Sequence, residues 1–271
     1  MDKIWLKNYP EGMPAEIDPD QFRSIPDLLD KLFVKFADRP AYHNLGHTIS
    51  YAELEQLSRA FATFLQGLPG MGKGERVAVM SPNLLQYPVV LFGILRAGMT
   101  VVNVNPLYTP RELEHQLKDS GAKAIVIVEN FAQSLQQVMG STAAEHVLTT
   151  QIGDLLPIPK RWLVNFVIKH VKKMVPAWRI DTAITLSTAL ERGRSASFAP
   201  VDVKSDDIAF LQYTGGTTGV AKGAMLTHRN ILANLEQTGI WISVSFKEGA
   251  EIIIAPLPMY HIFCLTSTLS F

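Results

Sequence analysis

A run of glycines and threonines that contains one lysine is typical of a loop that binds phosphate. It reads Tyr213-Thr-Gly-Gly-Thr-Thr-Gly-Val-Ala-Lys-Gly-Ala224. Glycines let backbone N–H groups turn toward an anion, because no Cβ is in the way and positive φ values are tolerated. Three threonine hydroxyls add donors, and the lysine adds a mobile positive charge. The residues expected to bind phosphate are therefore Tyr213, Thr214, Gly215, Gly216, Thr217, Thr218, Gly219, Val220, Ala221, Lys222, Gly223 and Ala224.

The alternative for this stretch is a surface turn rich in glycine and threonine. Four glycines, three threonines and a lysine fall within ten residues after an apolar run, which favours the phosphate loop. The loop differs from G-x-x-x-x-G-K-[ST], since Lys222 is followed by Gly223 rather than by serine or threonine. It also lacks G-x-G-x-x-G, so a dinucleotide pocket is not indicated.

The elements on either side of the loop would position it. Residues 208–212 form a short apolar run that indicates a buried strand. Thr227 stands at an N-cap position before residues 229–235, whose pattern predicts a helix. A strand, a loop of glycines and hydroxyls and a helix together form the layout of a phosphate cradle.

Residues 214–223 resemble the phosphate-binding motif of the adenylate-forming superfamily, which includes acyl- and aryl-CoA synthetases, luciferases and peptide-synthetase adenylation domains. Pro256-Leu-Pro-Met-Tyr-His-Ile-Phe263 resembles a second motif of that superfamily. Between Asn83 and Val128 the chain resembles one branch, the bacterial long-chain fatty acid–CoA ligases. The similarity covers essentially the whole chain.

This resemblance implies ATP-dependent activation of a long-chain fatty acid through an acyl adenylate and transfer to coenzyme A, with AMP and pyrophosphate released. The implied cofactors are ATP, Mg²⁺ and coenzyme A. Lys222 and Thr217 would stabilise the charge of the phosphoryl transition state. His261 would orient the acyl carboxylate, and Tyr260 and Phe263 would line the acyl site with it. The alternative for His261 is a structural side chain among apolar neighbours.

The resemblance also places several functional groups after residue 271. These are a Mg²⁺-binding glutamate, a ribose-binding aspartate, a hinge and the catalytic lysine of a mobile C-terminal domain. We therefore interpret the chain as the N-terminal portion of such a ligase, with the C-terminal domain absent, and expect it to be inactive alone. No metal ligand is predicted within the chain, since Mg²⁺ would bind through ATP and a residue beyond 271. Two alternatives stay open: an aryl-acid or amino-acid adenylating enzyme of the same superfamily, and a non-catalytic nucleotide-binding module.

Composition narrows the classes of partner. The chain has 25 basic and 25 acidic residues, so its formal net charge is zero and nucleic acid is not an expected partner. The single cysteine, Cys264, lies in an apolar run and is interpreted as a buried thiol. The N-terminus lacks the apolar centre of a signal peptide, and the longest uncharged apolar run, residues 88–95, is too short to span a bilayer. We expect a cytoplasmic protein and keep a homodimer open.

Short β-branched runs alternate with helical patterns along the chain. Strands are predicted over residues 76–80, 100–104, 124–128, 146–149 and 251–255, and helices over residues 25–36, 84–97, 110–120 and 131–139. Another helix opens at the capping box of Ser50 and Glu53. The alternation predicts an α/β fold of mostly parallel sheets flanked by helices. We divide it into N-terminal helices with a lead-in (1–70), a first α/β subdomain (71–200), and the loop with the start of a second α/β subdomain (201–271), whose sheet the N-terminal helices join.

A basic amphipathic segment interrupts the alternation as an insert over residues 155–178. Over residues 160–175, one broad face of a predicted helix carries Trp162, Leu163, Phe166, Val167, Val171, Met174 and Val175. The other side carries Arg161, Asn165, Lys169, Lys172 and Lys173. Such a helix can lie in a membrane interface, so peripheral contact with the inner face of the cell membrane is one interpretation. The other is a surface helix that packs its apolar face on the body and leaves its lysines in water.

Overall fold

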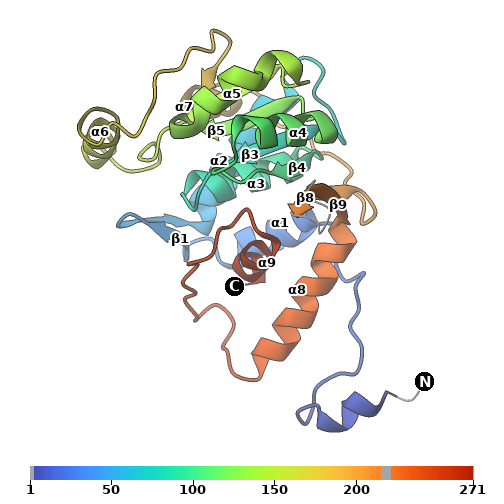
Figure 1. The fold of residues 1–271 in the computed structure, drawn as a ribbon. Coiled ribbons are helices and arrows are strands. Elements are labelled where there is room, and N and C mark those ends of the chain that lie inside the picture. The colour runs from blue at the N-terminus through green and yellow to red at the C-terminus, as the bar shows by residue number, and fades with distance from the viewer. Residues whose placement is uncertain (1–2, 215–220, 271) are drawn as a thin grey trace.

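The computed structural model describes residues 3–214 and 221–270. In that part of the chain, seven strands form one sheet in the order β7-β6-β5-β3-β4-β8-β9, and helices cover both of its faces (Figure 1). Neighbouring strands run parallel until the last pair, β8 and β9, which is antiparallel. The predicted α/β fold with a mostly parallel sheet flanked by helices is therefore confirmed.

The strands separate two apolar cores because successive side chains of a strand point to opposite faces. Val77 and Val79 contribute to one apolar cluster, and Ala78 and Met80 contribute to the other. The strands are β3 (Arg76–Met80), β4 (Thr100–Asn103), β5 (Ala124–Val128), β6 (His146–Thr150), β7 (Ile184–Thr185), β8 (Ile208–Thr214) and β9 (Lys222–Thr227). The sequence pattern predicts neither β9 nor the short strand β7.

The helices begin where the capping signals place them. Ser50, Thr109 and Thr227 each accept a hydrogen bond from the third backbone N–H of the helix that follows. Besides α6, which is described below, the α-helices of the described residues are α1 (Ile25–Lys35), α2 (Tyr51–Gln66), α3 (Gln86–Arg96), α4 (Pro110–Ser120), α5 (Ala132–Val138), α7 (Leu186–Arg194), α8 (His228–Ser243) and α9 (Ile262–Ser270). Short elements complete the fold: η1 (Ile4–Asn8), η2 (Glu129–Phe131), η3 (Met139–Ser141) and the antiparallel hairpin β1 (Pro40–Asn44) and β2 (His47–Ser50).

The amphipathic insert is helical over a shorter length than predicted. It forms α6 (Lys160–Phe166), which continues as one wider turn, η4 (Val167–Val171). Lys173 then adopts a left-handed backbone with φ +53°, which ends the helix before residue 175. Among the described residues, no helix is both long enough and apolar enough to cross a membrane.

The strand predicted over Glu251–Ala255 is wrong, since no strand is assigned there. Ile252 and Ile254 are 93% and 83% exposed, and no described strand pairs with the segment. A strand needs a neighbour to receive its backbone hydrogen bonds, and an apolar pattern alone does not supply one. The second sheet that the resemblance implies is likewise not formed by β8 and β9, which pair beside β4 in the first sheet. The three-part division of the chain stays a prediction.

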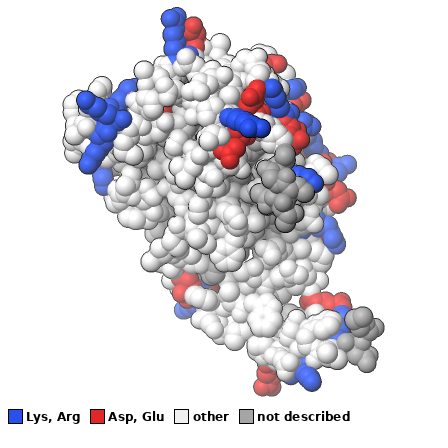
Figure 2. Space-filling model, in the orientation of Figure 1, with Lys and Arg blue, Asp and Glu red and all other residues white. Residues whose placement is uncertain are grey.

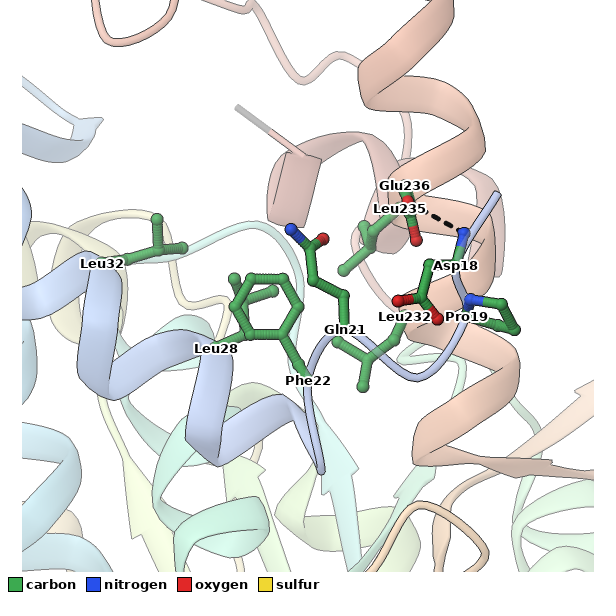
Figure 3. Close-up of a pocket in the computed structure, with 9 residues that line it drawn as sticks. All are labelled: Asp18, Pro19, Gln21, Phe22, Leu28, Leu32, Leu232, Leu235 and Glu236. Atoms are coloured by element: carbon green, nitrogen blue, oxygen red, sulfur yellow. Dashed lines mark hydrogen bonds between the residues drawn. The ribbon is translucent and has the colours of Figure 1, made fainter. Parts of the chain in front are cut away.

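The lead-in residues connect α1 to α8, far along the sequence. Figure 3 shows Pro19, Gln21 and Phe22 lying between the two helices, beside a small apolar cavity of about 170 Å³. The backbone N–H of Asp18 donates to Glu236 of α8, as the dashed line in Figure 3 marks. Nearby, the backbone N–H of Ile25 donates to the ring of His228 at the start of α8. These contacts fix α8, and with it β9, against the N-terminal helices.

Candidate active site

The predicted phosphate loop begins at the carboxyl end of β8, which lies beside the carboxyl end of β4. Ligands of open parallel sheets commonly bind at this edge. Thr214 ends β8 and is paired in register with Lys222, the first residue of β9. Both residues are exposed, and no ion pair of Lys222 occurs among the described residues. An exposed lysine without an acidic partner leaves its charge available to an anion such as a phosphate.

The central residues of the loop lie outside the described residues. They are Gly215, Gly216, Thr217, Thr218, Gly219 and Val220. Their predicted contacts with phosphate, and the catalytic role of Thr217, stay predictions.

The two ends of the loop are held by α4. The Tyr213 hydroxyl donates to Asp119 Oδ2 at 2.5 Å, and His115 Nε2 donates to the Ala221 carbonyl at 3.1 Å. Burial and the adjacent carboxylate raise the pKa of Tyr213, so it stays protonated and donates. Sequence reasoning missed both of these α4 residues, because neither belongs to a motif and each is brought near the loop only by the fold.

Glycine is required where β9 passes the tyrosine ring. A Cβ at Gly223 would lie 2.9 Å from the ring of Tyr213, closer than ordinary van der Waals contact. Gly223 therefore allows a close approach between β8 and β9, in addition to any contact with phosphate. Ala224 is paired with Gln212 in the same ladder.

A buried polar network connects β8 to the second motif. Gln212 donates from Nε2 to the Tyr260 carbonyl at 2.9 Å, and its Oε1 accepts from Asn103 Nδ2 at 3.2 Å. The Tyr87 hydroxyl lies 2.8 Å from Asn103 Oδ1 and 2.9 Å from the Met259 carbonyl, so both oxygens share its proton. These side chains come from β8, β4 and α3, and they hold residues 259–260 at the carboxyl edge of the sheet.

Asn83, which follows β3, holds the preceding part of the same motif. Its Nδ2 donates to the carbonyls of Ala255 and Leu257 at 3.0 and 2.8 Å, and its Oδ1 accepts from the Met259 N–H at 2.8 Å. One amide side chain thus fixes three backbone groups of a segment that has no regular secondary structure. The carbonyl of Asn83 in turn accepts from the side chain of Asn44 at 3.2 Å.

The predicted substrate-binding residues lie at the start of α9. Tyr260 is half-buried and packs against the main core, whereas His261 is exposed and Phe263 is 64% exposed. The Phe263 N–H donates to His261 Nδ1 at 3.4 Å, which leaves the proton of the neutral ring on Nε2. No partner for Nε2 is found in the part of the chain that the structure describes, so this N–H is available to a carboxylate.

The described residues contain no group of three or more His, Cys, Asp or Glu side chains placed to hold a metal ion. They do fit an anion, since Thr214 and the unpaired Lys222 face each other across the loop. Among the described residues, Thr214 and Lys222 are therefore the ones that could contact an ATP phosphate.

Two cavities lined by described residues lie away from the candidate site. An apolar pocket of about 710 Å³ is lined by α1, α8 and the segment after α8, including Phe33, Ile242, Phe246 and Ile252. Neither this pocket nor the smaller cavity of Figure 3 is lined by Lys222, Tyr260 or His261. Side-chain chemistry and the strand ends, rather than cavity size, therefore locate the candidate site.

Comparison with known proteins gives consistent matches. A model of the family described as "AMP-binding enzyme" matches residues 29–271. The chain is 54% identical to a long-chain-fatty-acid–CoA ligase of Escherichia coli O157:H7 over 98% of this chain and 47% of the relative. It is 51% identical to one of Haemophilus influenzae over 98% of this chain and 48% of the relative. The crystal structure of a long-chain-fatty-acid–CoA ligase from Archaeoglobus fulgidus matches with 25% identity and a TM-score of 0.74, covering 96% of this chain and 47% of that one. The chain thus spans about half the length of the curated relatives it matches.

Proposed function

This chain belongs to the family of AMP-binding enzymes, and we propose that it carries the ATP- and carboxylate-binding part of a long-chain fatty acid–CoA ligase. The observation that supports this most directly is the hydrogen bond from Gln212 to Tyr260, because it holds the second motif beside the strand that leads into the predicted phosphate loop. The substrate class rests on the names of the similar relatives, which are ligases of long-chain fatty acids.

The proposed reaction has two steps, and both act on the carboxyl group of the fatty acid. A carboxylate oxygen attacks the α-phosphorus of ATP, the bond from that phosphorus to the bridging oxygen breaks, and pyrophosphate leaves. The thiol sulfur of coenzyme A then attacks the acyl carbon, its proton is lost to solvent or base, and AMP leaves with both electrons of the broken C–O bond. Adenylation is needed because a free carboxylate repels nucleophiles and has a poor leaving group.

The positions of five residues of the candidate site support a role for each of them in this reaction. Lys222 would neutralise negative charge as pyrophosphate departs, and Thr214 would donate its hydroxyl to a phosphate oxygen. His261 would donate from Nε2 to the acyl carboxylate and so orient its other oxygen toward phosphorus. Tyr260 and Phe263 would supply apolar surface to the acyl chain. Bound Mg²⁺ would spread the charge of the phosphates that these residues contact.

A protein of the relatives' full length is the appropriate test object, since this chain spans about half of each relative. We propose that the 271-residue chain alone does not complete the reaction. A chimaera that continues residue 271 with the remaining residues of the E. coli O157:H7 relative would supply the rest.

Replacing Lys222 tests the proposed site. In the chimaera, we expect Lys222→Ala to lower ATP-dependent formation of palmitoyl-CoA by about 10²-fold or more, because transition-state charge loses its partner. Lys204→Ala is the matched control, since Lys204 is also exposed but lies outside the site. An unchanged rate in Lys222→Ala would remove this residue from the mechanism. A chimaera that binds Mg·ATP but forms no thioester from any acid would instead favour a non-catalytic nucleotide-binding module.

A further inference from the structure

The helix formed by α6 and η4 contacts the body of the protein through polar side chains. Asn165 accepts from the Gly153 N–H at 2.7 Å and donates to Asp154 at 3.1 Å. Lys169 forms an ion pair with Glu129 at 3.2 Å, and Val164 packs against the main core from the same side. The face that an amphipathic surface helix normally leaves in water is thus the face that holds this helix in place.

Five large apolar side chains of the helix and of the turn that ends it face solvent, whereas Val164, Val167, Ile168 and Val175 are half-buried. Trp162 and Leu163 are each 63% exposed, Phe166 is 58% exposed, Val171 61% and Met174 55%. We call these five residues the apolar ridge. A cluster of large exposed apolar side chains usually marks a surface that meets a partner or a membrane. Figure 1 places α6 at the periphery of the molecule, away from α8 and α9.

The charged residues of the segment that carries the ridge are all basic. From residue 155 to residue 180 the sequence has no Asp or Glu, and its charged residues are Lys160, Arg161, Lys169, Lys172, Lys173 and Arg179. Lys172 and Lys173 are exposed, and the described residues offer neither of them an ion pair. Figure 2 shows blue basic atoms beside white atoms over α6.

The positions of these lysines are fixed by the way in which the helix ends. The Met174 N–H donates to the Ile168 carbonyl at 3.0 Å, around the left-handed residue Lys173. Asn130 then donates from Nδ2 to the Met174 carbonyl at 2.9 Å. The ridge and its lysines therefore form one preordered surface.

We propose that the apolar ridge, with Lys172 and Lys173, docks on the surface of an anionic phospholipid bilayer. Trp162 and Phe166 would lie at the level of the headgroups and upper acyl chains, and the lysines would reach anionic headgroups. A protein partner fits less well, because the centres of protein interfaces are depleted in lysine. The inference rests on the proposed function in one respect: a bilayer is where long-chain fatty acids partition, so docking would place the enzyme beside its substrate.

Vesicle sedimentation tests the surface directly. With vesicles of phosphatidylglycerol and phosphatidylcholine, we expect the double variant Lys172→Glu and Lys173→Glu to bind at least about tenfold more weakly than the parent, because each lysine near an anionic surface contributes about fivefold. Trp162→Ser with Phe166→Ser should also weaken binding at least tenfold. Matched controls are Lys204→Glu with Lys247→Glu, and Ile4→Ser with Val34→Ser, which change exposed residues elsewhere. Both control pairs should bind like the parent.

Two outcomes would overturn the proposal. One is equal sedimentation of both ridge variants and the parent; the other is equal binding of the parent to pure phosphatidylcholine vesicles. If the ridge variants lost binding to a protein partner but kept binding to vesicles, the ridge would be assigned to that partner instead. Introduced into the chimaera, the ridge variants should keep ATP–pyrophosphate exchange driven by octanoate, a short acid delivered from water. If the parent binds vesicles but no fatty acid drives exchange in the chimaera, the proposed function fails while the docking surface stands.

Discussion

Gln212, the residue before the predicted phosphate loop, connects the second motif to strand β4 through the two ends of its side-chain amide. Its nitrogen donates to the Tyr260 carbonyl and its oxygen accepts from Asn103, while only 5% of the residue is exposed. A buried amide in this position has no water to replace lost partners. The geometry of the second motif therefore depends on Gln212, a residue of the strand β8 that precedes the first motif.

Replacing Gln212 by leucine should destabilise the chain and displace the second motif. Gln212→Leu leaves the Tyr260 carbonyl and the Asn103 amide unpaired, which we expect to cost about 2 kcal/mol or more. Gln116→Leu is the matched control, since Gln116 is also buried, donates one bond to the Asn103 carbonyl and has an Oε1 without a described partner. Urea unfolding of both variants measures the difference, and equal losses would show that Gln212 has no special role.

His228 should make the stability of the chain depend on pH. Burial lowers its pKa from 6.5 to about 4, against the opposing effect of Asp207, and its Nδ1 accepts from the Ile25 N–H. The folded state therefore keeps the ring neutral where the unfolded chain already binds a proton. The contribution is fully present above pH 6.5 and is lost as the pH falls toward 4, by roughly 3 kcal/mol.

His228→Gln removes this titration but keeps an oxygen that can accept from the Ile25 N–H. We expect the difference in unfolding free energy between parent and variant to shrink or reverse between pH 7 and pH 4.5. Urea midpoints at the two pH values provide the measurement. A constant difference would mean that His228 titrates alike in the folded and unfolded chains.

The motif residues could be predicted from sequence, but the residues that hold them could not. Glycines, threonines and a lysine at close spacing indicate phosphate binding wherever they occur. Asp119, His115 and Asn83 act through single hydrogen bonds to distant segments, and such bonds leave no local pattern. His228 is adjacent to a predicted cap, yet its burial depends on α1 packing over it.

At the scale of elements, local sequence signals are sufficient to predict a helix or strand wherever local interactions stabilise it. The capping box of Ser50, the helical pattern of residues 110–120 and the β-branched runs predict α2, α4 and the strands from β3 to β6 within a few residues. They failed for β9, whose sequence from Lys222 to Thr227 mixes glycine and polar residues and is a strand only because β8 pairs with it. At Glu251–Ala255 the local signals predict a strand that the structure does not contain, because this apolar run has no described neighbour to pair with.

Because α2 and α7 pack closely at Gly193, we expect one added methyl group there to lower the stability of the chain strongly. A Cβ at Gly193 of α7 would lie 1.8 Å from the Ala60 carbonyl oxygen of α2, so the two helices would have to separate. We expect Gly193→Ala to lower the melting temperature by about 10 °C or more. At Gly239 of α8 nothing lies within 4 Å of the added Cβ, so Gly239→Ala should leave stability unchanged or raise it by up to about 1 kcal/mol. Thermal unfolding that ranked these two variants in the opposite order would contradict the packing described for α2 and α7.

At the scale of the whole molecule, the order of strands decides what the site contains. Alternating helices and strands predict a parallel sheet but not which strands are neighbours, and several orders are compatible with the sequence. Placing β8 beside β4 brings Gln212 to Asn103 and the phosphate loop to the carboxyl edge. The apolar face of α6 shows the same limit, since the periodicity predicts an apolar face but not which side of the helix faces the body, which depends on Asp154 and Glu129.

Fatty-acid-dependent ATP–pyrophosphate exchange tests the central claim most directly, because it reports adenylation without requiring coenzyme A. It would be measured on the 271-residue chain and on the chimaera, with palmitate, 4-coumarate and a set of amino acids. We predict exchange in the chimaera that palmitate drives best, and none in the 271-residue chain. Exchange driven by 4-coumarate or an amino acid but not by palmitate would contradict the substrate class, and no exchange with any acid would contradict the proposed adenylation.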